Sequence, residues 1–218
     1  NISEYDTLSS EDKWNEYFDV ILANPPFFSP TGGIKPHSRF SVKSTRAEVL
    51  FVDYIVDHLK PNGRAGIIVP EGIIFQKGNA YKILRKKLVK DCLIGVISLP
   101  AGVFQPYSGV KTSILILDKN FSKNSDQIFF ADVGNDGFSL SVQRTPINEN
   151  DLPTLLSKIK KRDFKGDFVN TIPKTKILES LDFTLTVSDY IEKEICVSNF
   201  PIVKLGQVAD FQNGFAFK

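Results

Sequence analysis

The residues with the clearest chemical potential lie where an apolar run stops, in the segment FDVILANPPFFSP at residues 18–30. Asn24, Pro25, Pro26 and Phe27 follow one another there. Each proline fixes φ at about −65°, lacks a backbone N–H and keeps the preceding residue extended. The turn is therefore stiff and offers carbonyl oxygens without competing donors, beside the acceptor oxygen of Asn24 and the flat ring of Phe27.

This set of groups fits an exocyclic amine on a planar base. The lone pair of such an amine is delocalised into the ring, and two acceptors can draw it back onto the nitrogen. Asn24 Oδ1 and the Pro25 carbonyl can be those acceptors, while the ring of Phe27 stacks on the base with about 1–3 kcal/mol. The base must first leave its duplex. Positioned dipoles then supply the catalysis, without a metal ion or a nucleophilic side chain.

A structural interpretation accounts for the same four residues equally well. The Asn-Pro-Pro sequence can simply end a strand, and Phe27 can belong to the hydrophobic core. A short motif at the end of a strand does not decide between these two interpretations, so both stay open on the residues alone.

The composition limits the kind of protein without naming its function. The chain has 218 residues and a formal net charge of +2, so it lacks the strong basic field of a small DNA-coating protein. Cys92 and Cys196 are far apart, which is typical of unpaired thiols in a reducing cytoplasm. No segment is long and apolar enough to span a bilayer, so we expect a cytoplasmic protein and no membrane partner. We also expect a fragment truncated at both ends, because the chain starts at Asn1 and contains no methionine.

Apolar runs alternate with amphipathic segments along the chain, and their order predicts the fold class. Strands are expected at residues 17–23, 64–70, 92–100 and 111–119, with an edge strand at 127–133. Helices are expected at residues 46–60, from Gly78 onward, and at 151–164. This order predicts an α/β fold with a mostly parallel sheet between helices, in which the strand at 111–119 closes a hairpin and lies antiparallel.

Two details of these elements can be checked directly. The run at 17–23 predicts a strand buried on both faces. In the helix that begins after Gly78, the spacing places Leu84 and Leu88 inward and Arg85 outward with its lysine neighbours.

The sequence resembles a known family. Asn24-Pro25-Pro26-Phe27 matches the (D/N)PP(Y/F) motif of amino-methyltransferases that use S-adenosylmethionine, and the phenylalanine form is similar to N6-adenine DNA methyltransferases. The segments KSTRAEVLFVDYIVDHLKPNGRAGIIVPEGIIF and LPAGVFQPYSGVKTSILILDK resemble the modification subunit of type I restriction–modification systems, over residues 5–150. The resemblance implies a Rossmann-like methyltransferase that transfers a methyl group to a flipped adenine, with Asn24, Pro25, Pro26 and Phe27 as catalytic residues.

The resemblance also implies where the cofactor binds. In this family an acidic residue at the end of the preceding strand contacts the adenine of S-adenosylmethionine, and Asp6 in EYDTL occupies that position. The glycine-rich cofactor loop of the family is absent, and Thr31-Gly32-Gly33 follows the catalytic turn instead. We therefore expect the intact protein to be the enzyme and this chain alone to be inactive.

The last residues suggest a second part of the protein. The segment FPIVKLGQVADFQNGFAFK at 200–218 resembles the start of a target-recognition domain of a specificity subunit. We therefore expect a partial methyltransferase domain at 1–150, a helical or linker segment at 151–199 that joins the two parts from residue 171, and a recognition domain from 200. The expected partners are double-stranded DNA and the specificity and restriction subunits or fused domains.

Two other functions remain open. A protein glutamine-amide methyltransferase uses the same motif, because an amide nitrogen also has a delocalised lone pair. A catalytically silent module that keeps the fold for assembly is the non-enzyme alternative. The loop after the catalytic turn contains His37 and Arg39, where contact with phosphates and plain solvation are equally plausible. Gln105, Tyr107 and Ser108 can also face the target, without a catalytic role.

Overall fold

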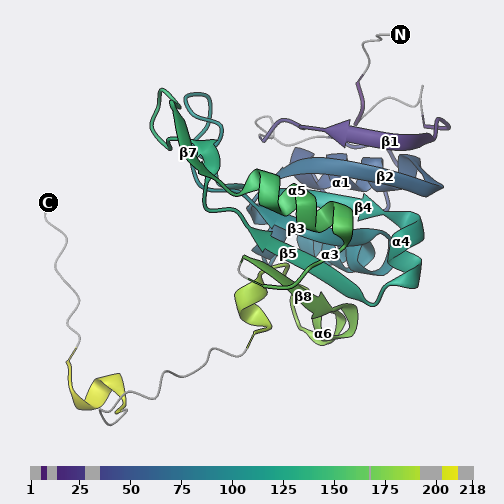
Figure 1. Ribbon diagram of the computed structural model, residues 1–218. Helices are drawn as coiled ribbons and strands as arrows, with labels where there is room; N and C mark the ends of the chain where they lie inside the picture. Colours follow the sequence, from purple (N-terminus) through teal and green to yellow (C-terminus); the bar gives the residue numbers. More distant parts are fainter. Residues whose placement is uncertain (1–5, 9–13, 28–34, 167, 192–202, 211–218) are drawn as a thin grey trace, which may run out of the picture.

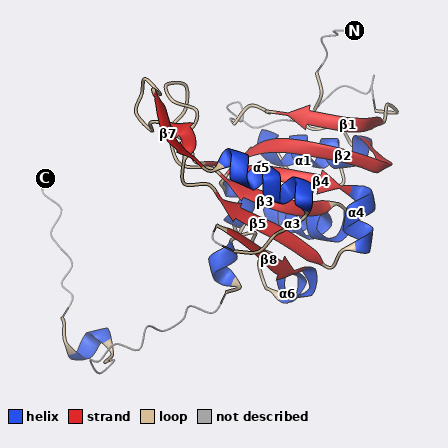
Figure 2. Cartoon of the chain, in the orientation of Figure 1, coloured by secondary structure: helices blue, strands red, loops and turns tan. Residues whose placement is uncertain are grey.

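A six-stranded sheet with helices on both faces forms the body of the molecule (Figures 1 and 2). The computed structural model describes residues 6–8, 14–27, 35–166, 168–191 and 203–210. The sheet contains β1 (Phe18–Ala23), β2 (Leu59–Pro70), β3 (Leu93–Ser98), β4 (Thr112–Asp118), β5 (Gln127–Asp132) and β8 (Val169–Pro173). Their order is β1-β2-β4-β3-β5-β8, and β6 (Asp136–Phe138) pairs separately with β7 (Pro146–Asn150).

The directions of the strands confirm the predicted fold class. β1 is parallel to β2, and β3 is parallel to β5, so four of the six strands run the same way. β4 runs antiparallel between β2 and β3, as the missing crossover before it predicted. The predicted edge strand at 127–133 is wrong in its position, because β5 is internal and β8 pairs antiparallel on its outer side.

The helices cover the two faces unequally. The helices are α1 (Ala47–His58), α2 (Gly72–Phe75), α3 (Asn79–Asp91), α4 (Lys119–Asn124), α5 (Leu152–Lys161) and α6 (Lys174–Glu179). The larger core joins α1, α3 and α6 to one face of the sheet. The smaller core lies under α5 on the opposite face, where Leu155 packs with Ile97 and Phe129. Figure 1 shows α5 in front of the sheet and α1 and α3 behind it. Among the described residues, no helix is long and apolar enough to cross a membrane.

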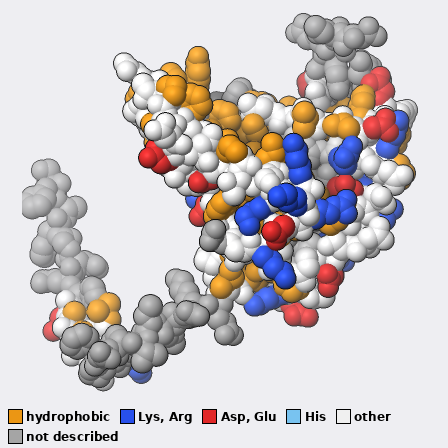
Figure 3. All heavy atoms as spheres, in the orientation of Figure 1, with side chains coloured by type: hydrophobic (Ala, Val, Ile, Leu, Met, Phe, Trp, Pro, Cys, Tyr) orange, Lys and Arg blue, Asp and Glu red, His pale blue; other side chains and the backbone are white. Residues whose placement is uncertain are grey.

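The outward side of α5 presents basic side chains to solvent. Figure 3 shows lysine and arginine atoms gathered on this face of the molecule. Lys160, Lys161 and Arg162 are exposed at the end of α5, and the Arg162 guanidinium lies 4.7 Å from the centre of the Phe121 ring.

The prediction of a strand buried on both faces is wrong for β1. β1 lies at the end of the sheet; Ile21 and Ala23 are partly buried against the larger core, but Val20 and Leu22 on the other face are 56% and 82% accessible. Within the described part of the chain β1 pairs with β2 alone, and α5 does not extend over it (Figure 1). An apolar run of β-branched residues predicts a strand, but it does not say which neighbours cover that strand.

Residues 168–191 pack onto the sheet, which differs from the linker expected from residue 171. β8 pairs with β5 from Val169 to Pro173. Ile177, Leu185 and Tyr190 belong to the larger hydrophobic core. The packed unit therefore reaches at least Tyr190, while the division into domains at residues 150 and 199 stays a prediction.

Candidate active site

The Asn24–Phe27 turn lies at the carboxyl end of β1, directly after the pairing of Ala23 with Ile67 of β2. Asn24 and Pro26 are exposed, and Pro25 and Phe27 are partly buried. Ligands of open α/β sheets bind at this edge, outside the carboxyl ends of the parallel strands. Asn24 and Pro26 of the turn are therefore accessible from solvent at the edge where such a sheet binds its ligands.

A second aromatic ring accompanies Phe27. The centre of the Phe104 ring lies 6.0 Å from that of Phe27, and the rings are nearly perpendicular, at 81°. This edge-to-face arrangement is a favourable one for two aromatic rings. Phe27 is thus half-buried against one ring, and it is not among the residues that pack into the three hydrophobic cores.

Phe104 comes from the connection between β3 and β4, which folds as a series of turns. The N–H of Gln105 donates to the Gly102 carbonyl at 3.0 Å, and the N–H of Ser108 donates to the Phe104 carbonyl at 3.0 Å. Gly102 has φ of +91°, a conformation that residues with a side chain rarely adopt. The same turns leave Tyr107 94% exposed. Gln105, Tyr107 and Ser108 were predicted to be able to face the target, but Phe104, which was not predicted, is the residue of this segment whose ring contacts Phe27.

Asp6 lies on the surface of the described structure. Its Oδ1 accepts a hydrogen bond from the N–H of Leu8 at 3.0 Å, and Leu8 is buried beside Trp14. The strand expected before Asp6 falls on residues 1–5, which lie outside the described residues. An exposed carboxylate here is compatible with a hydrogen-bond acceptor for a ligand, and its role as a cofactor contact stays a prediction.

The loop that returns from the catalytic turn is fixed by a buried carboxylate that the sequence analysis did not single out. Asp53 in α1 is fully buried, and its two oxygens accept from Ser41 Oγ at 2.7 Å and from the Val42 N–H at 2.9 Å. Lys87 Nζ in α3 lies 2.6 Å from both Asp53 and Asp57. In a helical sequence pattern an aspartate is normally predicted to lie on the surface. The burial of Asp53 and its contacts can therefore be seen only in the folded structure.

The charges of this anchor stabilise one another. Burial alone lowers the pKa of Lys87, but the hydrogen bonds to Asp53 and Asp57 outweigh it and raise the pKa above its usual value. The ammonium group is therefore held in its charged form. Since Lys87 also contacts Ser41 Oγ at 2.7 Å, the cluster joins the loop to α1 and α3.

His37 and Arg39 of the same loop pack against Trp14. The His37 ring lies 5.0 Å from the Trp14 ring, and the Arg39 guanidinium lies 5.6 Å from that ring. Arg39 is exposed and donates to Asn15 Oδ1 at 3.2 Å. The loop therefore presents Arg39 to solvent from a fixed aromatic base, while its contact with phosphates stays a prediction.

Comparison with known proteins identifies the family. The model of the N-6 DNA methylase family matches residues 1–197, which is most of the chain. The chain belongs to the N-6 DNA methylase family. The predicted resemblance to a type I modification subunit is confirmed by this match and by the relatives described next.

Relatives of this N-6 DNA methylase chain are methylase subunits of type I restriction enzymes. The EcoEI methylase subunit of Escherichia coli is 38% identical over 108 residues, which cover 49% of this chain and 22% of the subunit. The EcoKI methylase subunit of Escherichia coli K12 is 31% identical over 121 residues, which cover 56% of this chain and 22% of the subunit. The chain thus spans about a fifth of the length of these curated relatives.

A solved structure supports the same relationship. The type I restriction–modification system methyltransferase subunit from Streptococcus thermophilus superimposes with a TM-score of 0.68 at 26% identity. The match covers 86% of this chain and 41% of that one. A methylase of this family requires a methyl donor, and in the described part Asp6 and the Asn24–Phe27 turn are the residues expected to face donor and target.

Proposed function

We propose that the whole protein is an S-adenosylmethionine-dependent DNA methyltransferase that acts on adenine N6 as the modification component of a restriction–modification system. The observation that supports this most is the Asn24–Phe27 turn, with Asn24 exposed at the carboxyl end of β1, in an N-6 DNA methylase chain. The 218 residues are then one part of the enzyme, and the chain alone is expected to be inactive.

Asn24 and Pro25 hold the amine. The Asn24 Oδ1 and the Pro25 carbonyl accept the two N6 hydrogens and draw the lone pair of the nitrogen out of the purine ring. Neither proline of the turn has an N–H that could compete for these acceptors. Because the two oxygens are placed before the base arrives, their dipoles need no reorganisation during the transfer.

Phe27 and Phe104 hold the base. The face of Phe27 stacks on the flipped adenine, which offsets part of the cost of leaving the duplex by about 1–3 kcal/mol. The edge-to-face contact from Phe104, with ring centres 6.0 Å apart, supports the Phe27 ring in this position. Phe104 is therefore a positioning residue for the aromatic platform.

The donor supplies a methyl group bonded to a positively charged sulfur. Asp6 is the residue of this chain that would hold it, as a hydrogen-bond acceptor for its adenosine part. The exposed position of the Asp6 carboxylate fits that role. As the bond to N6 formed, the bond between the methyl group and the sulfur would break and leave a neutral thioether, and N6 would release one proton to solvent. No residue of the turn would form a covalent bond.

The proposed function also implies which molecules the whole protein binds. The enzyme acts on double-stranded DNA together with specificity and restriction subunits or fused domains, and the segment at 200–218 opens a recognition domain. Residues 203–210, the described part of that segment, are exposed throughout. They make a short helical turn at Leu205–Gln207.

The substitution Asn24→Ala tests the catalytic role in the full-length protein. Removing the acceptor is expected to lower adenine-N6 methylation by about a hundredfold or more while leaving the unfolding midpoint unchanged, because Asn24 is exposed. Methylation is measured as N6-methyladenine in DNA by mass spectrometry. Asn120→Ala is the matched control, since Asn120 is an exposed asparagine in α4, beyond the opposite end of the sheet.

The same assay separates the rival functions. Unchanged methylation in Asn24→Ala would remove the proposed role of the turn. Methylated glutamine in a protein substrate, with no product in DNA, would favour the amide methyltransferase. If the full-length protein transferred no methyl group to either substrate, the result would favour the third alternative, a catalytically silent assembly module.

A further inference from the structure

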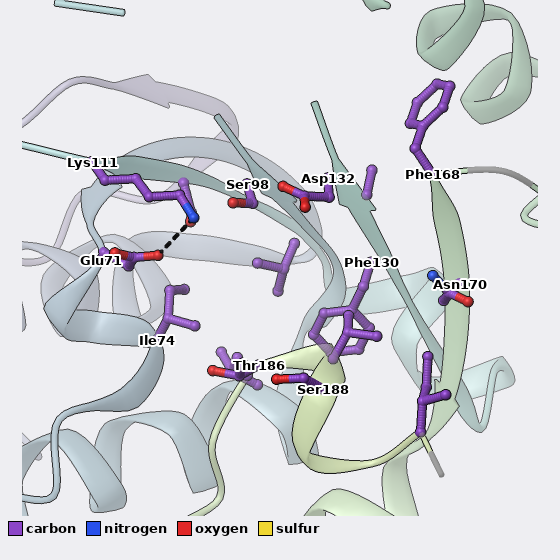
Figure 4. A pocket seen from close by; sticks show the side chains of 16 residues that line it. Glu71, Ile74, Ser98, Lys111, Phe130, Asp132, Phe168, Asn170, Thr186 and Ser188 are labelled. Carbon is purple, nitrogen blue, oxygen red and sulfur yellow. Dashed lines mark ion pairs between the residues drawn. The ribbon is translucent and has the colours of Figure 1, made fainter. Parts of the chain in front are cut away.

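A second cavity lies on the same sheet edge, away from the Asn24–Phe27 turn. It has a volume of about 560 Å³ and lies between the ends of β3 and β5, the start of β4, and the segment after α6. Figure 4 shows Ser98 and Asp132 on one side and Thr186 and Ser188 on the other. Neither the turn nor Phe104 lines this cavity, so it is separate from the site proposed for adenine.

Polar groups without partners line the cavity. Ser113 is only 2% exposed, yet its hydroxyl makes no hydrogen bond to any described residue. Within the described part, the partly buried side chains of Ser98 and Thr186 also make no hydrogen bond, and the exposed side chains of Asp132, Asn170 and Ser188 form the polar rim of the cavity. Buried polar groups in proteins are normally hydrogen-bonded. A ligand with both donors and acceptors would satisfy the Ser113 hydroxyl and could also bond to the polar rim.

The charges of the cavity disfavour an anionic ligand. Lys111 is paired with Glu71 at 3.1 Å, so its positive charge is already neutralised (Figure 4). Asp132 has no cationic side chain within ion-pair distance among the described residues. The lining thus has one carboxylate in excess, which repels phosphate and favours an uncharged molecule with hydroxyl or amino donors.

The remaining wall is apolar and suits a flat group. Ile74, Val96, Phe130 and Leu185 line it from α2, the sheet and the segment after α6. Asp132 is at the carboxyl end of β5, a strand that runs parallel to β3. Acidic residues near the ends of parallel strands are common acceptors for the ribose hydroxyls of nucleotides. The cavity therefore combines an acceptor for a sugar with an apolar wall for a base.

The segment that closes the cavity is held in place by long-range contacts. The Leu185 N–H donates to the Ile74 carbonyl at 2.9 Å. The buried Arg85 guanidinium donates to the Asp182 carbonyl at 2.8 Å and to the Phe183 carbonyl at 3.0 Å. The wall that includes Thr186 and Ser188 is therefore part of the folded domain and does not require a ligand to form.

The geometry points to a binding site for an uncharged nucleoside in this cavity. Asp132 accepts hydrogen bonds from the ribose, Ser113 and Thr186 bond to the polar edge of the ligand, and the base lies against Val96 and Phe130. This site is independent of methyl transfer at Asn24, because the two share no residue.

Equilibrium dialysis of the full-length protein with radiolabelled adenosine tests the site. S-adenosylmethionine is present in excess so that adenosine cannot occupy the site of the methyl donor. We expect one adenosine per chain, with binding weakened about tenfold in Asp132→Asn by loss of the charged acceptor and weakened in Ser113→Ala. Asp163→Asn is the matched control, because Asp163 is exposed and does not line the cavity.

Modified ligands sharpen the test. We expect 2′,3′-dideoxyadenosine to bind about tenfold more weakly than adenosine, because it cannot donate to Asp132. Adenosine monophosphate is expected to bind more weakly because of charge repulsion. Binding in Asn24→Ala is expected to equal the wild-type value, so failure of the methylation proposal would leave this result intact.

Two results would overturn the inference. One is adenosine binding that is absent, or that is the same in Asp132→Asn and the wild type. The other is binding of N-acetylargininamide in place of adenosine with the same dependence on Asp132, which would assign the cavity to a basic side chain of a protein partner.

Discussion

The β1 end of the sheet and the β8 end differ in how their apolar side chains are covered. At the β1 end, Val20 and Leu22 are 56% and 82% exposed, and within the described residues the strand pairs on one side. At the β8 end, Ile172, Ile177 and Leu185 are at most 4% exposed. The proposed catalytic turn thus follows the least covered strand of the six-stranded sheet, while the proposed nucleoside cavity lies in a closely packed region.

The difference shows two ways of building a site at one sheet edge. The Asn24–Phe27 turn takes its shape from its own prolines, so it needs few contacts with the rest of the chain. The cavity depends on residues almost a hundred positions apart, because Arg85 binds the Asp182 and Phe183 carbonyls. Substitutions in the first region should therefore alter activity, and those in the second should first alter stability.

The largest effect on stability is expected for Arg85→Met. The guanidinium is fully buried and donates to four carbonyls, those of Ile73, Gln76, Asp182 and Phe183. Methionine leaves these acceptors without a donor, and we expect unfolding to become easier by about 3–5 kcal/mol. Urea unfolding measures the change, with Lys90→Met at an exposed position of α3 as control. Equal stability of both variants would contradict the dependence of this region on long-range contacts.

A smaller loss is expected for Gly95→Ala in β3. An added Cβ would lie 2.1 Å from ring carbons of Phe129 in β5, and Phe129 stacks on Phe164 with ring centres 4.5 Å apart. The ring has to move, and overpacking of this kind is expected to cost about 3 kcal/mol. Gly206→Ala is the control, because no atom lies near its added Cβ. A midpoint of urea unfolding that did not fall would show that the β5 region repacks freely.

The sequence predicted the local features of both regions and missed the long-range ones. The strand–helix order and the missing crossover gave the sheet and the antiparallel β4, because these follow from periodicity and connection length. The stiffness of the Asn24–Phe27 turn is also local. Arg85 was predicted to point outward and is buried, because a helical pattern cannot show that carbonyls from Asp182 and Phe183 cover it.

The features of the site that the sequence did not predict also depend on contacts between distant parts of the chain. The exposure of β1 depends on which strands flank it, and apolar spacing contains no such information. The role of Asp53 could not be predicted either, because it depends on the contact between the loop at Ser41 and α1, which only the folded structure shows. Phe104 is 77 positions from its partner Phe27, so no local motif links the two rings.

The anchor at Lys87 tests a part of the β1 region that depends on long-range contacts. Lys87→Met removes the ammonium from the buried Asp53, and we expect a loss of about 2 kcal/mol near neutral pH. The folded-state pKa of Lys87 is raised above 10.5, so its stabilisation is complete below that pH and is lost as the pH rises through the folded-state value. The difference in unfolding free energy between wild type and variant should therefore shrink in alkaline solution. A constant difference would mean that the charge of Lys87 contributes nothing.

The smallest effect is expected for Leu22→Lys in β1. Leu22 is 82% exposed in this chain, so replacing it removes little buried apolar area, and the change in unfolding free energy should stay within about 0.5 kcal/mol. Leu115→Ala in β4 is the matched comparison, since Leu115 is fully buried and its truncation should cost about 2–5 kcal/mol. A charged residue on an exposed edge strand also opposes pairing with other chains, so less self-association is expected by light scattering. If Leu22→Lys destabilised the chain as much as Leu115→Ala, the β1 end would be covered as fully as the β8 end, and the contrast between the two regions would disappear.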